Sequence, residues 1–268
     1  AHHHQSTQSM KALIRRVLHG PPSEENKLIS EASVFPRYTP TTIAYRGMRL
    51  AVTDMLSVAW QIKEFFGDER MKFQANTERP LIIDCGANVG VSILYYRSIF
   101  PHAQVVCFEP DAQVFACLEA NLAENGITDV QCRKEVVWVH DQGVRFGSEG
   151  ADGGSILRET NAAVLPSIRL RDMLVEHASI DLLKIDIEGA ECDVLLDCDM
   201  ELARVRNLYV EYHSFPDRPQ QLHALLGLLQ RAGFRYYIER IGVHHKHPFA
   251  GLEQAEMDMQ LDIHAVRI

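Results

Sequence analysis

The stretch LIIDCGANVG, residues 81–90, joins a short apolar run to a loop that contains two glycines. Leu81–Ile83 is apolar without alternation, which predicts a strand buried on both faces of a sheet. Gly86 and Gly90 allow a tight turn and a close approach of the backbone to a ligand. Val89–Ile99 predicts a helix, and the N-terminus of a helix carries unpaired N–H groups and a charge of about +0.5. This strand, turn and helix could therefore hold a carboxylate or a phosphate.

Strand and helix patterns alternate from residue 80 onward. The predicted strands that follow the first are Gln104–Phe108, one within Val130–Val139, Ile180–Ile187, Asn207–Tyr212, Phe234–Arg240 and Gln260–Val266. The predicted helices are Asp111–Asn125, one that ends near Leu196, and one marked by Leu222, Leu225, Leu226 and Leu229. Apolar strands that alternate with helices predict an α/β fold with a mostly parallel sheet covered on both faces, closed by an antiparallel pair. In such sheets, ligands bind outside the carboxyl ends of the strands.

The second predicted strand is followed by Glu109 and Pro110, and Glu109 lies 19 residues after Gly90. An acidic residue at this distance accepts hydrogen bonds from ribose hydroxyls in nucleoside-binding folds. A dinucleotide is disfavoured, because its fingerprint G-x-G-x-x-G requires glycine where this chain has Asn88. The loop could hold a group smaller than a pyrophosphate, such as the aminocarboxylate of S-adenosylmethionine. The alternative is that Asp84 and Glu109 only cap the ends of strands.

Charged residues gather at the ends of two later strands. In the stretch DLLKIDIEGAE (181–191), strand alternation places Lys184, Asp186 and Glu188 on one face. Glu211 and His213 share a face in the next strand. An unpaired ion in a central strand costs several kcal/mol, so these groups are expected at the open end of the sheet or in pairs. One interpretation is a structural ion pair between Lys184 and Asp186. The other is a site in which the carboxylates and the imidazole deprotonate a hydroxyl or bind a divalent cation.

Residues 11–75 have a different pattern, with four prolines, and we interpret them as a cap or lid. Within them, a hairpin is predicted over Ile43–Val52 and a helix over Asp54–Phe66. Residues 76–268 form the predicted main domain. Residues 1–10, with three consecutive histidines, are interpreted as the remnant of an affinity tag.

Two loops have compositions that could indicate a role at the site. The segment Gly147–Ser155, rich in Gly and Asp, is predicted to lie over the site. The segment Gly242–Gly251 contains His244, His245 and His247, but their spacing matches no standard metal site, which favours a solvated loop.

The charge, the apolar runs and the cysteines of the chain limit the kinds of partner that we expect. The net charge of −9 lacks the basic footprint of a nucleic-acid-binding protein. No run of about 18 apolar residues predicts a membrane span, and no secretory signal is visible. The six cysteines form no Cys-x-x-Cys pair, which predicts reduced thiols in a cytoplasmic protein and no structural zinc.

With these residues placed, the chain resembles the FkbM family of methyltransferases from about Ile43 to Ile268. The similar stretches are LIIDCGANVG (81–90), FEPD (108–111), SIRLRDML (167–174), DLLKIDIEGAE (181–191) and LDIHAVR (261–267). The resemblance implies the class I methyltransferase fold, which is Rossmann-like, with a seven-stranded sheet whose last strand is antiparallel. It also implies S-adenosylmethionine as the methyl donor.

The resemblance further assigns roles to single residues. The methionine part of the donor is implied to lie against the loop formed by Asp84, Gly86, Ala87, Asn88, Val89 and Gly90. Glu109 and Pro110 are implied to hold the ribose, and Glu135 to lie near the adenine. Asp186, Glu211 and His213 match positions that face the methyl group.

We therefore expect an S-adenosylmethionine-dependent O-methyltransferase that acts on a hydroxyl of a small molecule, sugar or glycan. His213 is the expected general base, with Asp186 and Glu211 orienting it or the acceptor; the alternative is Mg²⁺ bound by the two carboxylates. A nicotinamide-dependent reductase is a second possible function, but it would need the glycine that Asn88 replaces and a Tyr-x-x-x-Lys pair, which is absent. A non-catalytic module that binds the cofactor and regulates a partner is a third, although it would not need the charged strand ends.

Overall fold

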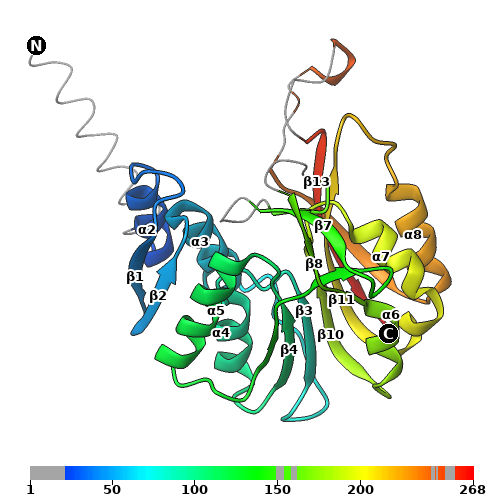
Figure 1. Ribbon diagram of the computed structural model, residues 1–268, viewed down its shortest axis with the longest axis horizontal. Coiled ribbons are helices and arrows are strands. Elements are labelled where there is room, and N and C mark those ends of the chain that lie inside the picture. The colour runs from blue at the N-terminus through cyan, green and yellow to red at the C-terminus, as the bar shows by residue number, and fades with distance from the viewer. Residues whose placement is uncertain (1–21, 149–153, 158–161, 243–244, 246, 251–256) are drawn as a thin grey trace, which may run out of the picture.

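A seven-stranded sheet forms the centre of the molecule (Figure 1). The computed structural model describes residues 22–148, 154–157, 162–242, 245, 247–250 and 257–268. The strands lie in the order β12-β13-β11-β10-β3-β4-β5, and β13 runs in the direction opposite to the other six strands of this sheet. Their bounds are β3 Leu81–Cys85, β4 Gln104–Phe108, β5 Gln131–Arg133, β10 Ile180–Ile185, β11 Val205–Ser214, β12 Arg235–Arg240 and β13 Met259–Val266. The predicted α/β fold and its closing antiparallel pair are confirmed.

Helices cover both faces of the sheet (Figure 1). One face packs against α4 (Val91–Ile99) and α5 (Ala112–Glu124), and the other packs against α6 (Leu170–Val175), α7 (Glu191–Cys198) and α8 (Leu222–Arg231). Successive strand residues point to opposite faces, so Ile82 belongs to the hydrophobic cluster on the first face and Ile83 to the cluster on the second. Both side chains are fully buried. Burial on both faces explains why these strands are apolar without alternation.

The cap consists of α2 (Glu24–Ala32), a hairpin of β1 (Thr41–Tyr45) and β2 (Met48–Val52), α3 (Met55–Ile62) and the π-helical turn η1 (Lys63–Gly67). The predicted hairpin and helix are therefore confirmed. Asp54 is the N-cap of α3, where its carboxylate accepts hydrogen bonds from the amide and the hydroxyl of Ser57 at 3.2 and 2.6 Å.

The cap shares one hydrophobic cluster with the sheet. Ile43, Leu50 and Ile62 of the cap belong to the same buried cluster as Ile82 of β3. Asn121 of α5 adds polar contacts across this junction. Its amide group donates to the carbonyl oxygens of Ala51 and Val89 at 2.9 and 2.8 Å and accepts from the Ala51 amide at 2.6 Å. The sequence pattern changes near residue 75, but the core continues across that point.

Several elements were not predicted. Helix α2 lies between Pro22 and Pro36, in a stretch where the prolines indicated broken structure; they lie outside the helix instead, and Ser23 caps it. Short strand pairs also join the sheet's later connections: β6 (Val136–Trp138) with β9 (Ser167–Arg169), and β7 (Val144–Gly147) with β8 (Ala162–Leu165). They contain three or four residues each, too few to show a hydrophobic period.

Some predictions fall outside the described residues, namely the tag remnant at 1–10, the middle of the Gly147–Ser155 loop, and His244. Of the part of the chain that the structure describes, no helix has the length and apolar character that crossing a bilayer requires.

Candidate active site

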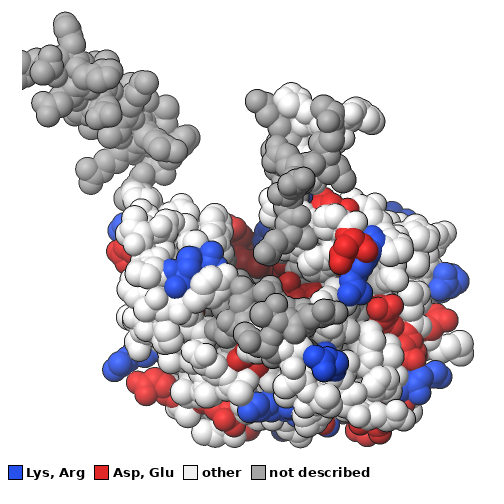
Figure 2. Space-filling model, turned by 45° about the horizontal axis from the view of Figure 1, so that its top comes forward, with Lys and Arg blue, Asp and Glu red and all other residues white. Residues whose placement is uncertain are grey.

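A cavity of about 760 Å³ opens at the carboxyl ends of β3, β4, β10 and β11. Residues of the cap, of the loop after β3 and of the loop after β10 all line it. Figure 2 shows the surface hollowed here, with acidic side chains in red inside the hollow. The structure thus brings the two predicted halves of the site, the glycine loop and the charged strand ends, into one space.

The loop after β3 meets the cavity through Gly86, Ala87 and Asn88. Gly86 has φ +90°, and a Cβ there would collide with the carbonyl oxygen of Asp186. The amides of Gly86 and Ala87 both donate to the carbonyl oxygen of Phe108, at 3.0 and 2.9 Å. Glycine is required at this position because the loop passes directly against the backbone that follows β10.

The other predicted loop residues lie away from the cavity. Val89 is fully buried in the core, and Gly90 is the N-cap of α4 with φ +95°. Asp84 is also fully buried, beneath the loop, where it accepts a hydrogen bond from the Ser92 hydroxyl at 2.5 Å. Its other oxygen lies 3.2 Å from the Lys184 ammonium. The structure therefore gives Asp84 a part in holding the loop rather than a place on the cavity wall.

Glu109 lines the cavity at the end of β4, next to Pro110. Its carboxylate accepts hydrogen bonds from the amides of Asn88 at 3.1 Å and Asp111 at 2.9 Å. Burial raises the pKa of this carboxyl to about 8, against the opposing effect of those backbone hydrogen bonds. Glu135 lines the cavity as well, and it pairs with Arg133 through both carboxylate oxygens at 2.6 and 3.1 Å.

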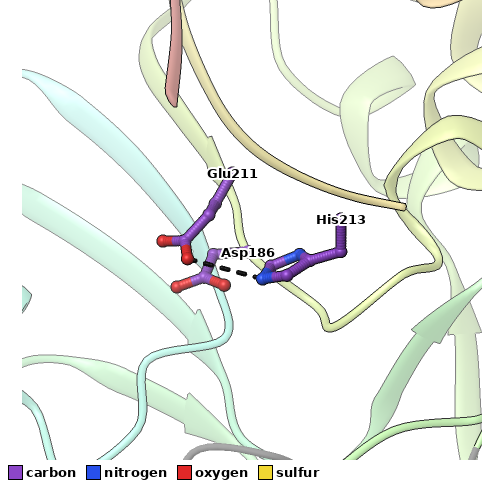
Figure 3. Close-up of side chains that lie close together, drawn as sticks. All are labelled: Asp186, Glu211 and His213. Carbon is purple, nitrogen blue, oxygen red and sulfur yellow. Dashed lines mark ion pairs between the residues drawn. The ribbon is translucent and has the colours of Figure 1, made fainter. Parts of the chain in front are cut away.

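Asp186, Glu211 and His213 converge at the ends of β10 and β11 (Figure 3). One potential ligand atom from each lies within 4.8 Å of those of the other two. Asp186 and Glu211 line the cavity and keep 26% and 16% of their side chains exposed. The predicted pairing of Lys184 with Asp186 is present, with nitrogen and oxygen 3.3 Å apart. Lys184 also donates to the carbonyl oxygen of Gly86 at 2.8 Å, so this one ammonium joins both strand ends.

His213 lies behind this wall, and its side chain is fully buried. Its Nδ1 is 2.9 Å from Glu191, and its Nε2 is 3.4 Å from Glu211 and 3.6 Å from Glu188. Burial alone would lower the pKa of His213, but the surrounding carboxylates raise it well above the usual value. The carboxylates around the ring therefore favour its protonated form.

The turn after β10 encloses His213. Glu188 and Gly189 both have positive φ, at +56° and +99°. The carboxylate of Glu191 accepts hydrogen bonds from the amides of Ile187 and Gly189 at 3.2 and 2.9 Å, and this folds the turn back onto the ring. A non-glycine residue at positive φ costs about 1–3 kcal/mol, which the surrounding contacts must offset.

The pKa values of the two cavity carboxylates, Asp186 and Glu211, are shifted in opposite directions. Burial and the charge of Glu211 raise the pKa of Asp186 to about 7. Although burial opposes it, the hydrogen bond and charge of His213 hold the pKa of Glu211 below its usual value. Gln260 of β13 donates to Glu211 at 2.6 Å, which fixes this carboxylate in place. At neutral pH, Asp186 is therefore the group of this pair that exchanges a proton most readily.

The sequence patterns missed several residues at this site. Glu64 of η1 and Tyr209 of β11 line the cavity, and the Tyr209 hydroxyl donates to Asp262 of β13 at 2.7 Å. Tyr209 shares the strand face of Glu211 and His213, so the same alternation could have found it. Glu64 gave no such signal, because its position depends on how the cap packs.

Comparisons with known proteins agree that the chain is similar to methyltransferases. The model of the methyltransferase FkbM domain matches residues 84–236, more than half of the chain. The chain is 29% identical over 231 residues to methyltransferase sdnD of Sordaria araneosa, which covers 70% of this chain and 87% of that protein. It is 30% identical over 176 residues to the 2-O-methyltransferase NoeI of Sinorhizobium fredii, with 56% and 71% covered.

A third relative differs in length. The chain is 29% identical over 241 residues to the AMB antimetabolite synthetase AmbE of Pseudomonas aeruginosa, and the match spans 72% of this chain but 11% of that protein. Among solved structures, an S-adenosylmethionine-dependent methyltransferase from Agrobacterium tumefaciens is similar with a TM-score of 0.52 and 9% identity, covering 87% of this chain and 72% of that one. The implied class I methyltransferase fold is confirmed.

Proposed function

This chain belongs to the methyltransferase FkbM family, and from that premise we propose that it transfers a methyl group from S-adenosylmethionine to a hydroxyl oxygen of a small molecule. The observation that supports this most is that one cavity joins the Gly86–Asn88 loop and Glu109 to the carboxylates of Asp186 and Glu211. The reductase alternative loses its basis, because the family is one of methyltransferases.

The cavity fits this donor in size and chemistry. Its volume of about 760 Å³ lies within the ~300–1,000 Å³ typical of small-molecule sites. Glu109 can accept hydrogen bonds from ribose hydroxyls, and Phe108 and Val137 supply apolar wall for a base. Bound there, S-adenosylmethionine supplies an electrophilic methyl carbon on a sulfonium. Burial raises the pKa of Glu109 to about 8 in the unliganded protein, and hydrogen bonds donated by a diol would favour the ionised carboxylate and lower that pKa.

Asp186 is the general base in this proposal. It lines the cavity and has a pKa of about 7, so its carboxylate can take the proton of a hydroxyl near neutral pH. His213 was the expected base, but its ring is fully buried and the carboxylates around it favour its protonated form. Its charge instead keeps Glu211 ionised and in place beside Asp186.

The remaining residues orient the acceptor. Glu211, fixed by Gln260, can accept a second hydrogen bond from the acceptor. Lys184 holds Asp186 and the Gly86 carbonyl together, which sets the distance between the base and the donor loop. Correct orientation of two reactants can supply about 7–11 kcal/mol of the barrier reduction, so these contacts matter as much as the base.

A mechanism based on Mg²⁺ would use Asp186, Glu211 and His213 as ligands. A histidine must be neutral to bind a metal ion, whereas the carboxylates around His213 favour its protonated form. Lys184 already occupies one side of Asp186. These two facts favour proton transfer over metal catalysis, and a chelator distinguishes the two.

The first test of the proposed function is a binding experiment. At about 100 times its dissociation constant, S-adenosylhomocysteine should stabilise the protein by about 2.7 kcal/mol in thermal or denaturant unfolding, because it binds only the folded state. NADH at the same concentration should give no shift. A panel of hydroxylated acceptors with labelled methyl donor then tests transfer, with and without EDTA. Stabilisation by NADH alone would refute the proposal, and binding without transfer to any acceptor would favour a regulatory module.

We expect Glu109→Gln to weaken binding of S-adenosylhomocysteine at least tenfold in calorimetry. Hydrogen bonds to a charged acceptor contribute about 1.5–3 kcal/mol, and glutamine removes the charge while keeping the side chain's size. Glu119→Gln, an exposed position on α5 away from the cavity, is the matched control and should bind as the wild type does. Equal affinity in both variants would exclude Glu109 from the donor site.

A further inference from the structure

One side of the helix that α3 and η1 form together lines the cavity. Leu56, Trp60 and Glu64 follow one another at intervals of four residues along α3 and η1, so they lie on the same side of the helix. All three line the cavity. The acceptor end of the site is therefore built in part by the chain before residue 68.

Trp60 is the most prominent of these side chains. It keeps 55% of its surface exposed, which is unusual for the largest apolar side chain. The face of an indole ring attracts cations through its quadrupole, more strongly than the faces of the other aromatic side chains. A ligand in the cavity would cover this ring, and a cationic ligand would gain most from it.

Carboxylates outnumber available cations at this end. The cavity-lining carboxylates here are those of Glu64, Asp186, Glu188 and Glu211. The Lys184 ammonium is already held by the Gly86 carbonyl oxygen and by Asp84. Arg37, which also lines the cavity, is bound by both oxygens of Asp54 at 3.0 Å. Lys184 also lies 3.3 Å from Asp186, and His213 lies 3.4 Å from Glu211. Glu188 is 3.6 Å from the same ring, so Glu64 is the carboxylate of this group that has no ion pair with a described residue.

Glu64 is the carboxylate with the weakest protein contacts. Among the described residues, its side chain accepts one hydrogen bond, a 3.4 Å contact from the Tyr209 hydroxyl, which lies closer to Asp262 at 2.7 Å. Burial, followed by the charges of Asp262 and Glu211, raises the pKa of Glu64 to about 8. Lys184 compensates the charge of Glu64 only in part, so the carboxyl holds a proton more readily than usual, and an ammonium group could take the place of that proton.

We propose that the methyl acceptor is a hydroxylated amine, such as an amino sugar or an amino alcohol, whose ammonium group binds between the Trp60 indole and the Glu64 carboxylate. This rests on the proposed function and names the acceptor of the same site. The ammonium has no lone pair, so it is not the nucleophile. The new bond joins the methyl carbon to the hydroxyl oxygen, the carbon–sulfur bond of the donor breaks, and the hydroxyl proton passes to Asp186.

Two other occupants would suit parts of this wall. A neutral polyol could use the carboxylates as hydrogen-bond acceptors, but it would not compensate the charge of an ionised Glu64. A divalent cation would compensate the charge, but it would leave the exposed indole without a role. An organic ammonium accounts for both the ring and the carboxylates.

The test compares matched ligands on the protein loaded with S-adenosylhomocysteine. D-Glucosamine and 2-aminoethanol are titrated by calorimetry at about pH 6.5, where an amine is protonated, beside their N-acetyl derivatives, which keep the hydroxyls but lose the charge. We expect each amine to bind at least about tenfold more tightly than its acetylated partner. Equal or tighter binding of the acetylated forms, or no binding of either amine, would overturn the proposal. So would Mg²⁺ binding at the same site that displaces the amines at millimolar concentration.

Two variants test where the ammonium group binds, and a third is the control. Glu64→Gln should reduce the preference for the amine to within about threefold, and Trp60→Leu should weaken amine binding at least about fivefold. Glu31→Gln, an exposed position on α2 away from the cavity, is the matched control and should leave the preference unchanged. An unchanged preference in Glu64→Gln would also overturn the proposal. All variants should bind S-adenosylhomocysteine within twofold of wild type, and a wild type that fails to bind it would instead refute the proposed function.

Discussion

Asp186→Asn is expected to lower turnover by about 10²- to 10⁴-fold, the usual contribution of a placed general base. Asparagine keeps the size of the side chain and the backbone carbonyl that faces Gly86, but it cannot take the hydroxyl proton. Because the pKa of Asp186 is raised to about 7, the carboxyl is protonated and inactive below that pH and ionised above it. Wild-type turnover should therefore rise with pH through about 7, and the variant's residual activity should lose this dependence. Single-turnover methyl transfer measured between about pH 5.5 and 8.5 tests both points.

Asp217→Asn provides the control, because Asp217 is an exposed carboxylate that lines the same cavity. Its turnover and pH profile should match those of the wild type. Both variants should retain affinity for S-adenosylhomocysteine, which separates a chemical defect from a binding defect. Near-normal turnover in Asp186→Asn would refute Asp186 as the base. Loss of wild-type activity in EDTA, restored by Mg²⁺, would assign these carboxylates to a metal mechanism instead.

Gly86→Ala is expected to lower the free energy of unfolding by about 2–5 kcal/mol and to abolish measurable donor binding. Two costs add here. An L-residue at φ +90° loses about 1–2 kcal/mol, and forcing a methyl group into a filled space costs about 1–3 kcal/mol more. The filled space belongs to the carbonyl oxygen of Asp186, so relief of the collision moves the donor loop away from the end of β10. Urea unfolding and calorimetry with S-adenosylhomocysteine measure the two effects.

Gly126→Ala separates backbone strain from the collision. Gly126 follows α5 with φ +73°, and a Cβ there would meet nothing within 4 Å. This variant should lose only the ~1–2 kcal/mol of strain and should bind the donor normally. If Gly86→Ala is no less stable than Gly126→Ala, the collision with the Asp186 backbone does not lower the free energy of unfolding.

The central strands could be predicted well from sequence because their burial is set locally. Gln104–Phe108 matches β4 at both ends, since the apolar run stops at Glu109, where the strand reaches the cavity. The face shared by Glu211 and His213 was also correct, because alternation follows from the geometry of any strand. Alternation does not predict how deeply a side chain is buried. His213 lies behind the cavity wall because the turn from Glu188 to Glu191 folds over it.

The cap's share of the site could not be predicted in the same way. Glu64 lies 145 residues before Tyr209, whose hydroxyl it approaches. No local period links two such positions, and their contact depends on how a helix packs against a sheet assembled later in the chain. The hairpin and helix of the cap could be predicted because their patterns are local, whereas their function depends on tertiary packing.

The contact between Asn121 and Ala51 has a consequence for the chain while it is being made. A ribosome that adds about 5–20 residues per second needs roughly 4–14 s to travel the 70 residues between the two positions. During that interval, Ile43, Leu50 and Ile62 have emerged without the strand and helices that later bury them. Nascent chains are therefore expected to expose these apolar side chains, and to depend on chaperones, at least until α5 is complete. Faster translation of codons 51–121 should shorten this exposure and raise the yield of folded protein.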